Sequence, residues 1–161
     1  MRMIRMLIKC LVVNLLALLL FIIDRILKLY FVENPTIVIG GDFFWGLLNF
    51  EFAKNFGIAF GILFTQIILV PFVVVITLIL FSFLINAYQK RNFWEIGSLT
   101  FIIAGAISNL FDRLRFGYVI DYINVPWFTV FNLADCLITT GVIILIFDVW
   151  FKPKLVNKKS L

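Results

Sequence analysis

The chain contains no histidine among its 161 residues. This absence excludes a Ser/His/Asp triad, a Cys/His dyad, a zinc site with histidine ligands and an imidazole proton shuttle. Cysteine is nearly absent as well, because Cys10 and Cys136 are the only two and no C-x-x-C spacing occurs. A single pair in apolar stretches does not define a disulfide framework, so we interpret both as buried free thiols. Carboxylates remain the obvious acid and base groups.

Charge is also scarce, since charged residues make up 14% of the chain and apolar residues 63%. These values lie far outside the range of soluble proteins and predict a membrane protein with a single domain. The net charge of +5 alone could suggest a nucleic-acid partner. The basic residues, however, stand in short groups at the ends of apolar runs, which is typical of oriented membrane spans. We therefore expect contact with membrane lipids and none with nucleic acid.

Four apolar runs predict four transmembrane helices, each about as long as the roughly 20 residues that a bilayer core requires. We place them at about 7–31, 66–87, 94–111 and 131–150, with extramembrane loops at about 32–65 and 113–130. The first run follows Arg2, Arg5 and Lys9 and has no small-x-small cleavage site before Asp24. We interpret it as a retained span rather than a cleaved signal peptide.

Basic residues predict the orientation of the spans. With four spans, both termini lie on the same side as the Lys90-Arg91 link, and nine of the fourteen Lys and Arg residues gather there. This bias predicts cytoplasmic termini and places the two larger loops at the outer face. Strand-like segments at 36–39 and 48–53, separated by Gly40-Gly41-Asp42, predict a small extracytoplasmic β-sheet that rests on the membrane surface. Pro126-Trp127 in the second loop is a candidate interfacial anchor.

Three aspartates between 105 and 138 lie among apolar residues, where a carboxylate costs roughly 2.5–3.5 kcal/mol on insertion scales. Asp112 has Arg113 beside it and Arg115 nearby, so we interpret Asp112 as a structural acid paired with arginine. Asp121 and Asp135 have no basic neighbour, and we predict that these two carry the chemistry. Two carboxylates held close at low dielectric share one proton, which is the basis of aspartic-protease catalysis.

Helical spacing groups further polar residues. Asp24 and Lys28 are four residues apart at the outer end of the first span, in the favoured order for an ion pair. Two polar stripes face the expected bundle interior, one with Gly105, Asn109, Asp112 and Arg113, the other with Asn132, Asp135 and Thr139. Polar packing between helices explains either stripe alone, so at this point a structural role stays open beside a chemical one.

Five sequence blocks resemble those of bacterial lipoprotein signal peptidases, the signal peptidase II family of aspartyl peptidases. Asp24-Arg25-Ile26-Leu27-Lys28 resembles Asp-x-x-(Thr/Ser)-Lys, and Asn55-Phe56-Gly57-Ile58-Ala59-Phe60-Gly61 resembles Asn-x-Gly-x-Ala-Phe-Gly. The segment from Gly105 to Arg113 resembles Gly-Ala-x-Gly-Asn-x-x-Asp-Arg, with Ser108 at the second glycine. Gly117-Tyr118-Val119-Ile120-Asp121-Tyr122 resembles Gly-x-Val-x-Asp-Phe, and Phe131-Asn132-Leu133-Ala134-Asp135 resembles Phe-Asn-x-Ala-Asp.

The resemblance implies a four-helix membrane peptidase in the bacterial cytoplasmic membrane, with Asp121 and Asp135 as its catalytic dyad. Its substrate would be a prolipoprotein whose lipobox cysteine carries diacylglyceryl, cut just before that cysteine. The residues implied to shape the site or bind substrate are Asn55, Gly57, Asn109, Asp112, Arg113, Asn132 and Ala134, with Asp24 and Lys28 supporting it. The resemblance implies no cofactor and no metal, and nothing in the sequence suggests an obligate partner, so we expect a monomer.

A membrane transporter or proton-relay subunit is the alternative from another class, because buried acids also build proton relays. Such a relay predicts acids at several depths, whereas the acids here gather toward one face. A purely structural membrane scaffold would not require Asp121 and Asp135. The Gly-x-Gly-Asp motif of presenilin-type proteases does not fit Ile39-Gly40-Gly41-Asp42.

Overall fold

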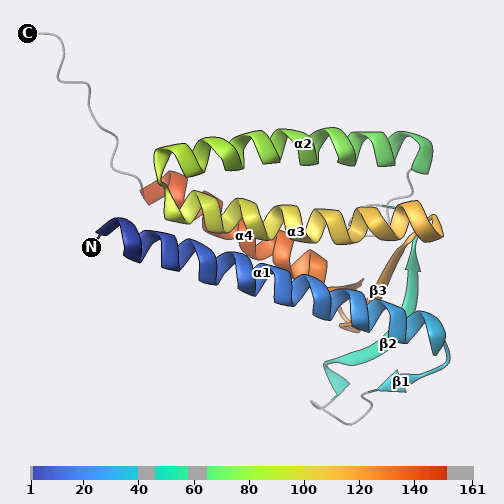
Figure 1. Cartoon of the computed structure of the whole chain (residues 1–161). Coiled ribbons are helices and arrows are strands. Elements are labelled where there is room, and N and C mark those ends of the chain that lie inside the picture. Colours follow the sequence, from blue (N-terminus) through green and yellow to red (C-terminus); the bar gives the residue numbers. More distant parts are fainter. Residues whose placement is uncertain (1, 40–45, 58–64, 152–161) are drawn as a thin grey trace, which may run out of the picture.

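The computed structural model describes residues 2–39, 46–57 and 65–151 of the chain. Within these ranges, four helices form a bundle with a small sheet at one end (Figure 1). The helices are α1 (Arg2–Glu33), α2 (Gln66–Lys90), α3 (Phe93–Phe116) and α4 (Leu133–Phe151). Each is long and apolar enough to cross a membrane. The predicted membrane fold of four helices and a small sheet is confirmed.

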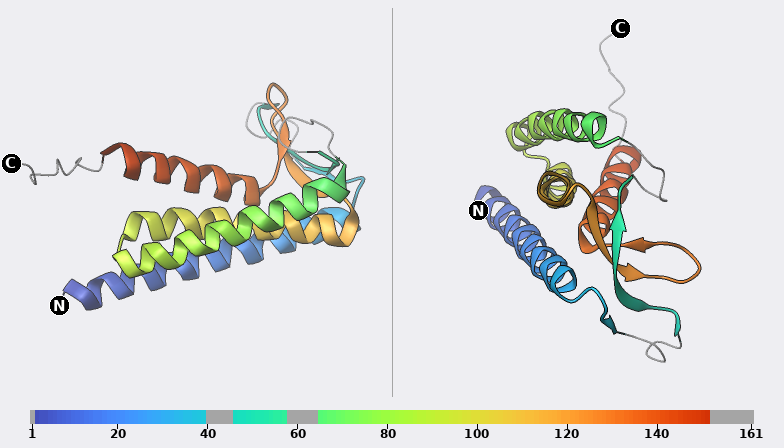
Figure 2. Two further views of the ribbon diagram at one scale, coloured as in Figure 1. Left: turned by 90° about the horizontal axis from the view of Figure 1, so that it is seen from above. Right: turned by 90° about the vertical axis from the view of Figure 1, so that its right-hand side faces the viewer.

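Helix α3 forms the centre of the bundle, because it packs against each of the other three helices. The end-on view shows α1, α2 and α4 arranged around it (Figure 2). Helix α3 also carries the site-forming polar residues Asn109 and Asp112, both buried. The other three helices expose long apolar faces, as expected of surfaces in contact with lipid.

The C-terminal end of α3 differs from the prediction. We expected the span to end at 111 and a loop to begin at Arg113, because the segment becomes charged there. The helix instead continues to Phe116, where Gly117 adopts a left-handed conformation with φ of 78° and donates its N–H to the carbonyl oxygen of Arg113. The additional turn remains helical because Asp112, which has no exposed surface, finds its partners inside the protein.

The sheet has the order β1-β2-β3-β4 and is antiparallel throughout. Its strands are β1 (Val38–Ile39), β2 (Asn49–Asn55), β3 (Val119–Asn124) and β4 (Val130–Phe131). The central pair joins the two segments that precede and follow the α2–α3 hairpin, with Ala53 opposite Asp121 and Asn55 opposite Val119. Since side chains alternate along a strand, Asn55 and Asp121 share one face of the sheet.

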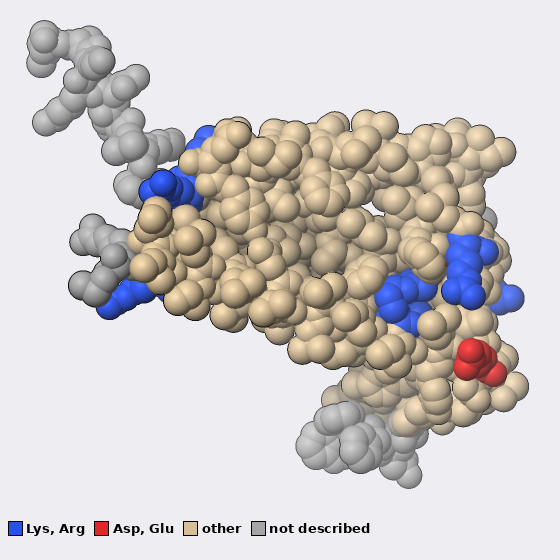
Figure 3. Space-filling view, viewed as in Figure 1, with Lys and Arg blue, Asp and Glu red and all other residues tan. Residues whose placement is uncertain are grey.

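Charged side chains gather at the two ends of the molecule on the face seen in Figure 3. An uncharged band separates these ends, as a bilayer core requires. The N-terminal end of α1 and the C-terminal end of α4 lie together, opposite the sheet (Figure 1). The four C-terminal lysines, Gly40-Gly41-Asp42 and the segment 58–61 of the second block lie outside the described residues.

Two glycines allow α3 and α4 to pack at very short range. A Cβ atom on Gly105 would lie 2.3 Å from the carbonyl oxygen of Ala134, and one on Gly141 would lie 2.6 Å from that of Ser98. Both obstacles are backbone atoms, so a side chain at either position forces the helices apart. The contacts at Gly105 and Gly141 therefore fix the spacing of the two helices.

We expect Gly141→Ala to destabilise the protein by about 1–3 kcal/mol, because the methyl group meets helix backbone that has no room to yield. Gly97→Ala is the matched control, since its Cβ would lie 3.6 Å from Val13 Cγ1, an ordinary contact. Alanine also favours a helix over glycine by about 1 kcal/mol. Thermal unfolding in one detergent should therefore show a lower Tm for Gly141→Ala alone, and equal Tm values would contradict the close packing.

Candidate active site

Asp121 lies in the middle of β3 and is 2% exposed. Its two carboxylate oxygens accept hydrogen bonds from different elements. Nδ2 of Asn55, at the end of β2, donates to Oδ2 at 3.0 Å, and Nδ2 of Asn132, just before α4, donates to Oδ1 at 2.6 Å. The sheet register and the start of α4 thus hold this side chain in one orientation.

Asp135 lies in the first turn of α4, where Asn132 caps the helix. The Asp135 N–H donates to Oδ1 of Asn132 at 2.9 Å, and the Asn132 N–H donates back to Oδ2 of Asp135 at 3.2 Å. This reciprocal pair resembles a capping box and orients the carboxylate. Nδ2 of Asn109 on α3 donates to the remaining oxygen, Oδ1, at 2.8 Å.

Two asparagines connect the carboxylates of Asp121 and Asp135. Asn132 donates to Asp121 and bonds to Asp135 through its backbone, while Asn109 donates to Asp135 and accepts from Nδ2 of Asn132 at 3.2 Å. Nζ of Lys28 donates to the same Oδ1 of Asn109 at 2.8 Å. Because Oδ1 of Asn109 faces two donors, its Nδ2 faces Asp135.

Burial, and after it the charge of Asp135, raises the pKa of Asp121 to about 7. The hydrogen bonds from Asn55 and Asn132 and the charge of Lys28 oppose this shift without cancelling it. A carboxyl group with such a pKa is largely protonated just below neutral pH. The pair is therefore poised to hold one proton, the state in which one member acts as an acid and the other as a base.

A buried cluster of ion pairs contacts Asn109, the residue that donates to Asp135. Lys28 has no exposed surface, and its Nζ lies 3.1 Å from Oδ2 of Asp24 and 2.8 Å from Oδ2 of Asp112. Arg25 forms a second ion pair with Asp112. The expected pair of Asp24 and Lys28 is confirmed.

The predicted pairing of Asp112 with an arginine is confirmed, but this arginine is neither of its neighbours Arg113 and Arg115. Asp112 pairs with Arg25 and with Lys28 of α1, because its side chain points into the α1–α3 interface. Arg113 points the other way, and its Nη2 donates to the carbonyl oxygen of Gly57 at 3.0 Å. The Gly57 N–H in turn donates to Oδ1 of Asn55 at 3.0 Å, so Gly57 links the end of β2 to α3.

Asp24 also contacts the start of α4. Its Oδ1 accepts the backbone N–H of Ala134 at 3.2 Å and the hydroxyl of Tyr122 at 2.9 Å, and its Oδ2 accepts the hydroxyl of Ser108 at 2.5 Å. Burial, and after it the charge of Asp24, raises the pKa of Tyr122, so its hydroxyl remains a donor. Sequence reasoning did not assign Tyr122 to the site, although its departure from the family pattern was a signal.

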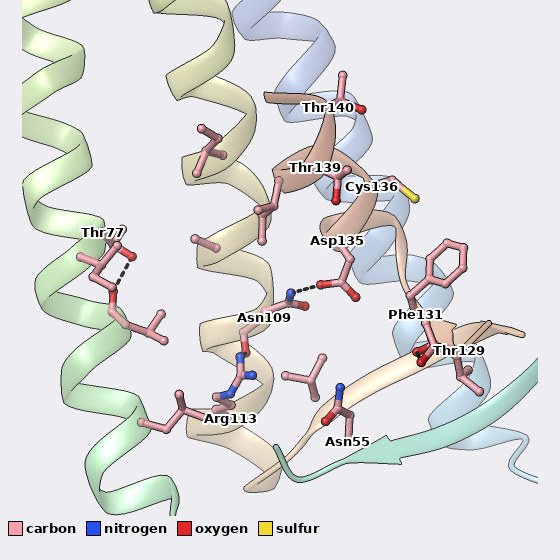
Figure 4. A pocket seen from close by; sticks show the side chains of 18 of the residues that line it. Asn55, Thr77, Asn109, Arg113, Thr129, Phe131, Asp135, Cys136, Thr139 and Thr140 are labelled. Atoms are coloured by element: carbon pink, nitrogen blue, oxygen red, sulfur yellow. Dashed lines mark hydrogen bonds between the residues drawn. The ribbon is translucent and has the colours of Figure 1, made fainter. Parts of the chain in front are cut away.

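A cavity of about 790 Å³ opens beside Asp135 between α2, α3, α4 and the sheet. Asn109 on α3 points toward Asp135 on α4 across this space, while Arg113 lies further along α3 and Asn55 lies at the end of the cavity next to the sheet (Figure 4). Its other walls are largely apolar and come from α2, from α4 and from residues 128–131. Asp135 lines the cavity directly, whereas Asp121 lies behind Asn55 and Asn132 and is not part of the lining.

The predicted site residues therefore converge, including Ala134, whose backbone is fully buried against Gly105. Part of the second block, 58–61, lies outside the described residues. In the part of the chain that the structure describes, no three His, Cys, Asp or Glu side chains gather in a way that could hold a metal ion. The arrangement is suited to general acid–base chemistry by paired carboxylates next to a mainly apolar cavity.

Known proteins resemble this chain along most of its length. A lipoprotein signal peptidase of Streptococcus agalactiae serotype Ia is 32% identical over 141 residues, covering 86% of this chain and 92% of the relative. One from Halothermothrix orenii is 34% identical over 144 residues, which cover 88% of this chain and 97% of the relative. One from Caldicellulosiruptor bescii is 37% identical over 133 residues, with coverages of 79% and 83%.

A solved bacterial membrane enzyme structure has a TM-score of 0.76 at 26% identity and covers 93% of this chain and 94% of its own. A second has a TM-score of 0.67 at 29% identity, with coverages of 88% and 94%. The family model described as signal peptidase (SPase) II matches residues 16–151. Together with the four-helix fold and the paired carboxylates, this match shows that the chain belongs to the signal peptidase II family.

Proposed function

We propose that the chain is a membrane aspartyl endopeptidase that cleaves diacylglyceryl-modified prolipoproteins just before the lipobox cysteine. The observation that carries this proposal is the pair Asp121 and Asp135, bridged by Asn109 and Asn132 at one end of a mainly apolar cavity. Relatives named lipoprotein signal peptidases support the choice of substrate.

The proposed chemistry uses one proton shared by the two carboxyl groups. The ionised member accepts a proton from a water molecule while the water oxygen attacks the scissile peptide carbonyl. The protonated member donates to the carbonyl oxygen, which gives a tetrahedral diol. The carboxyl group that took the water proton then protonates the leaving amine as the C–N bond breaks, and the other carboxylate takes one hydroxyl proton back from the diol as the C=O bond forms again. Asn109 and Asn132 hold the carboxylates through these steps. The pair ends with one proton, as it began.

The cavity suits an apolar signal peptide. Leu69, Val73 and Ile76 form the α2 wall, and α4 contributes Ile138 and the hydroxyl group of Thr139. Because α2 and α4 each pack on α3 and flank this space, a substrate helix would enter from the lipid phase beside them. A volume of about 790 Å³ is within the roughly 300–1,000 Å³ range of sites for small ligands, so only a short part of the substrate would be enclosed.

We also propose cytoplasmic termini and an active site at the outer face of the cytoplasmic membrane. The excess of basic residues at the end of the bundle that holds the N-terminus supports this orientation. The β3–β4 hairpin projects sideways past α4 (Figure 2), and Trp127 in its turn is 87% exposed. Tryptophan favours the membrane interface, so this hairpin would hold the sheet against the outer leaflet.

Cleavage assays in lipid vesicles test the proposed substrate. We expect the purified protein to cleave a prolipoprotein carrying diacylglyceryl on its lipobox cysteine and to leave the unmodified precursor at least about 100-fold less processed, the loss typical of reactant misplacement. Mass spectrometry of both products locates the cut. A precursor whose lipobox cysteine is replaced by serine is the control for adventitious proteolysis. Equal rates on lipidated and unmodified precursor would contradict the proposal.

Turnover should fall as the pH rises through about 7, because Asp121, whose pKa is raised to about 7, then loses its proton and the pair has no acid left. The same shift affects stability. The pKa in the folded state lies above the ordinary value of 3.8, so the stabilisation from protonated Asp121 is complete below about pH 3.8 and is lost as the pH rises through about 7. A rate profile without this alkaline decline would exclude the shared-proton scheme.

A further inference from the structure

Two hydroxyl groups stand at positions where the chain departs from the family blocks quoted above. Ser108 replaces the second glycine of the third block, and Tyr122 replaces the phenylalanine of the fourth. Leu27 conversely lacks the hydroxyl group that the first block usually carries. Both hydroxyl groups donate to the buried carboxylate of Asp24, Ser108 to Oδ2 at 2.5 Å and Tyr122 to Oδ1 at 2.9 Å.

Tyr122 connects the neighbours of both catalytic aspartates. It follows Asp121 directly in β3, so a shift of Tyr122 also shifts the strand that carries Asp121. Its hydroxyl oxygen accepts the backbone N–H of Leu133 at 3.1 Å, at the first position of α4. Oδ1 of Asp24 accepts the next N–H, that of Ala134, at 3.2 Å. One tyrosine and one carboxylate thereby tie β3 to the start of α4.

The three side chains that make these contacts are buried. Tyr122 is 1% exposed, Asp24 and Ser108 have no exposed surface, and none of the three lines the cavity. The Tyr122 ring stacks on Phe31 of α1 with centroids 5.5 Å apart and planes within 5° of parallel. The ring is therefore held by packing, and the hydroxyl supplies the polar link.

We infer that Tyr122 is a positioning residue whose hydroxyl, with that of Ser108, holds Asp24 against α4 and so sets the spacing between Asp121 and Asp135. The inference rests on the proposed function. Without the hydroxyl, the N–H of Leu133 loses its acceptor and Asp24 loses a donor, so the start of α4 is less firmly held relative to β3. Because the carboxylates must stay aligned within a fraction of an ångström, a small displacement lowers turnover.

Tyr122→Phe keeps the stacked ring and removes only the hydroxyl. We expect kcat to fall by roughly 10- to 100-fold. KM should stay within about twofold of wild type, because none of the three residues touches the cavity where substrate binds. Tyr88→Phe is the matched control, since Tyr88 is 39% exposed and lies near the C-terminal end of α2, at the end of the bundle opposite the sheet (Figure 1). An unchanged kcat in Tyr122→Phe would overturn the inference.

A titration separates positioning from mere stability. Asp135 raises the pKa of Asp121 and Lys28 lowers it, so a change in spacing shifts the titration midpoint of Asp121. We expect the carboxyl band of Asp121, followed by infrared spectroscopy and assigned with Asp121→Asn, to titrate at a different pH in Tyr122→Phe. This measurement needs no turnover, so it tests the inference even if the wild type cleaves no lipidated precursor. A lower Tm with an unshifted midpoint would reduce Tyr122 to a structural residue.

The double variant Ser108→Ala with Tyr122→Phe tests whether both hydroxyl groups act through Asp24. Two donors to one carboxylate should couple, so the combined loss of kcat should differ from the product of the single losses. Losses that multiply independently would show that Ser108 does not share the role of Tyr122. A wild type that cleaves the lipidated precursor beside an unaffected double variant would overturn this inference and leave the proposed function intact.

Discussion

Asp121→Asn and Asp135→Asn should each abolish measurable turnover, a loss of at least about 10²–10⁴-fold, the range for removing one acid–base group. Asparagine fills nearly the same volume and keeps one acceptor oxygen, while its amide N–H group faces the second of the two donors that each carboxylate binds. The asparagine amide neither gains nor releases a proton near neutral pH, so it cannot take over the acid or the base role of either aspartate. Each variant should still insert and fold.

The measurement is cleavage of the lipidated precursor beside thermal unfolding of the same preparations. Asp148→Asn is the matched control, because it makes the same change on α4 near the opposite end of the helix. The stability of Asp121→Asn relative to wild type should be higher at about pH 8 than at about pH 5, since wild type loses the stabilisation from protonated Asp121 as the pH rises through about 7. Full activity in either active-site variant would refute the dyad.

Lys28→Met should cost about 3–5 kcal/mol of stability, because removing one partner of a buried ion pair leaves charge without compensation. Lys28 is 0% exposed and is the cation that touches both Asp24 and Asp112. Its loss also frees Oδ1 of Asn109 from one of two donors, so the amide that faces Asp135 is less firmly oriented. We expect activity to fall together with stability.

Thermal unfolding of Lys28→Met beside Arg115→Met checks this expectation, since Arg115 is an exposed cation near the end of the same bundle. Combining Lys28→Met with Asp24→Asn should restore part of the loss, because Asp24 forms its ion pair with Lys28 whereas Asp112 keeps its pair with Arg25. This combination also helps if the single variant does not fold. A Tm for Lys28→Met as high as that of Arg115→Met would show that the buried ion pairs of Lys28 contribute little to the stability of the protein.

The membrane spans could be predicted because hydrophobicity and length are properties of the local sequence. The pairing of Asp112 could not, because its partners Arg25 and Lys28 lie on α1, more than 80 positions earlier in the chain. Adjacent Arg113 was the nearest cation in sequence, but neighbouring residues on a helix point in different directions. Helix α3 continues to Phe116, beyond the span end expected at about 111, because Asp112 finds its charged partners inside the protein.

The candidate site was predicted more completely than the details of the fold. The asparagines and aspartates came from the block pattern, and the transporter alternative is not favoured by the family to which the chain belongs. What sequence reasoning missed was the role of Tyr122 and Ser108. In the folded protein, β3, α3 and α1 bring both hydroxyl groups to the carboxylate of Asp24. No spacing along the chain predicts this contact.

The close packing at Gly105 and Gly141 has a consequence for the range of substrates. It joins α3 and α4 through backbone contacts, whereas α2 packs mainly on α3 and lies on the opposite side of the cavity. The α2 wall of the cavity is thus free of the backbone contacts that join the α3 and α4 walls, which hold the carboxylate of Asp135. Tilting of α2 would admit signal peptides of different bulk without disturbing the reacting groups, so one set of chemical groups can serve a whole population of precursors.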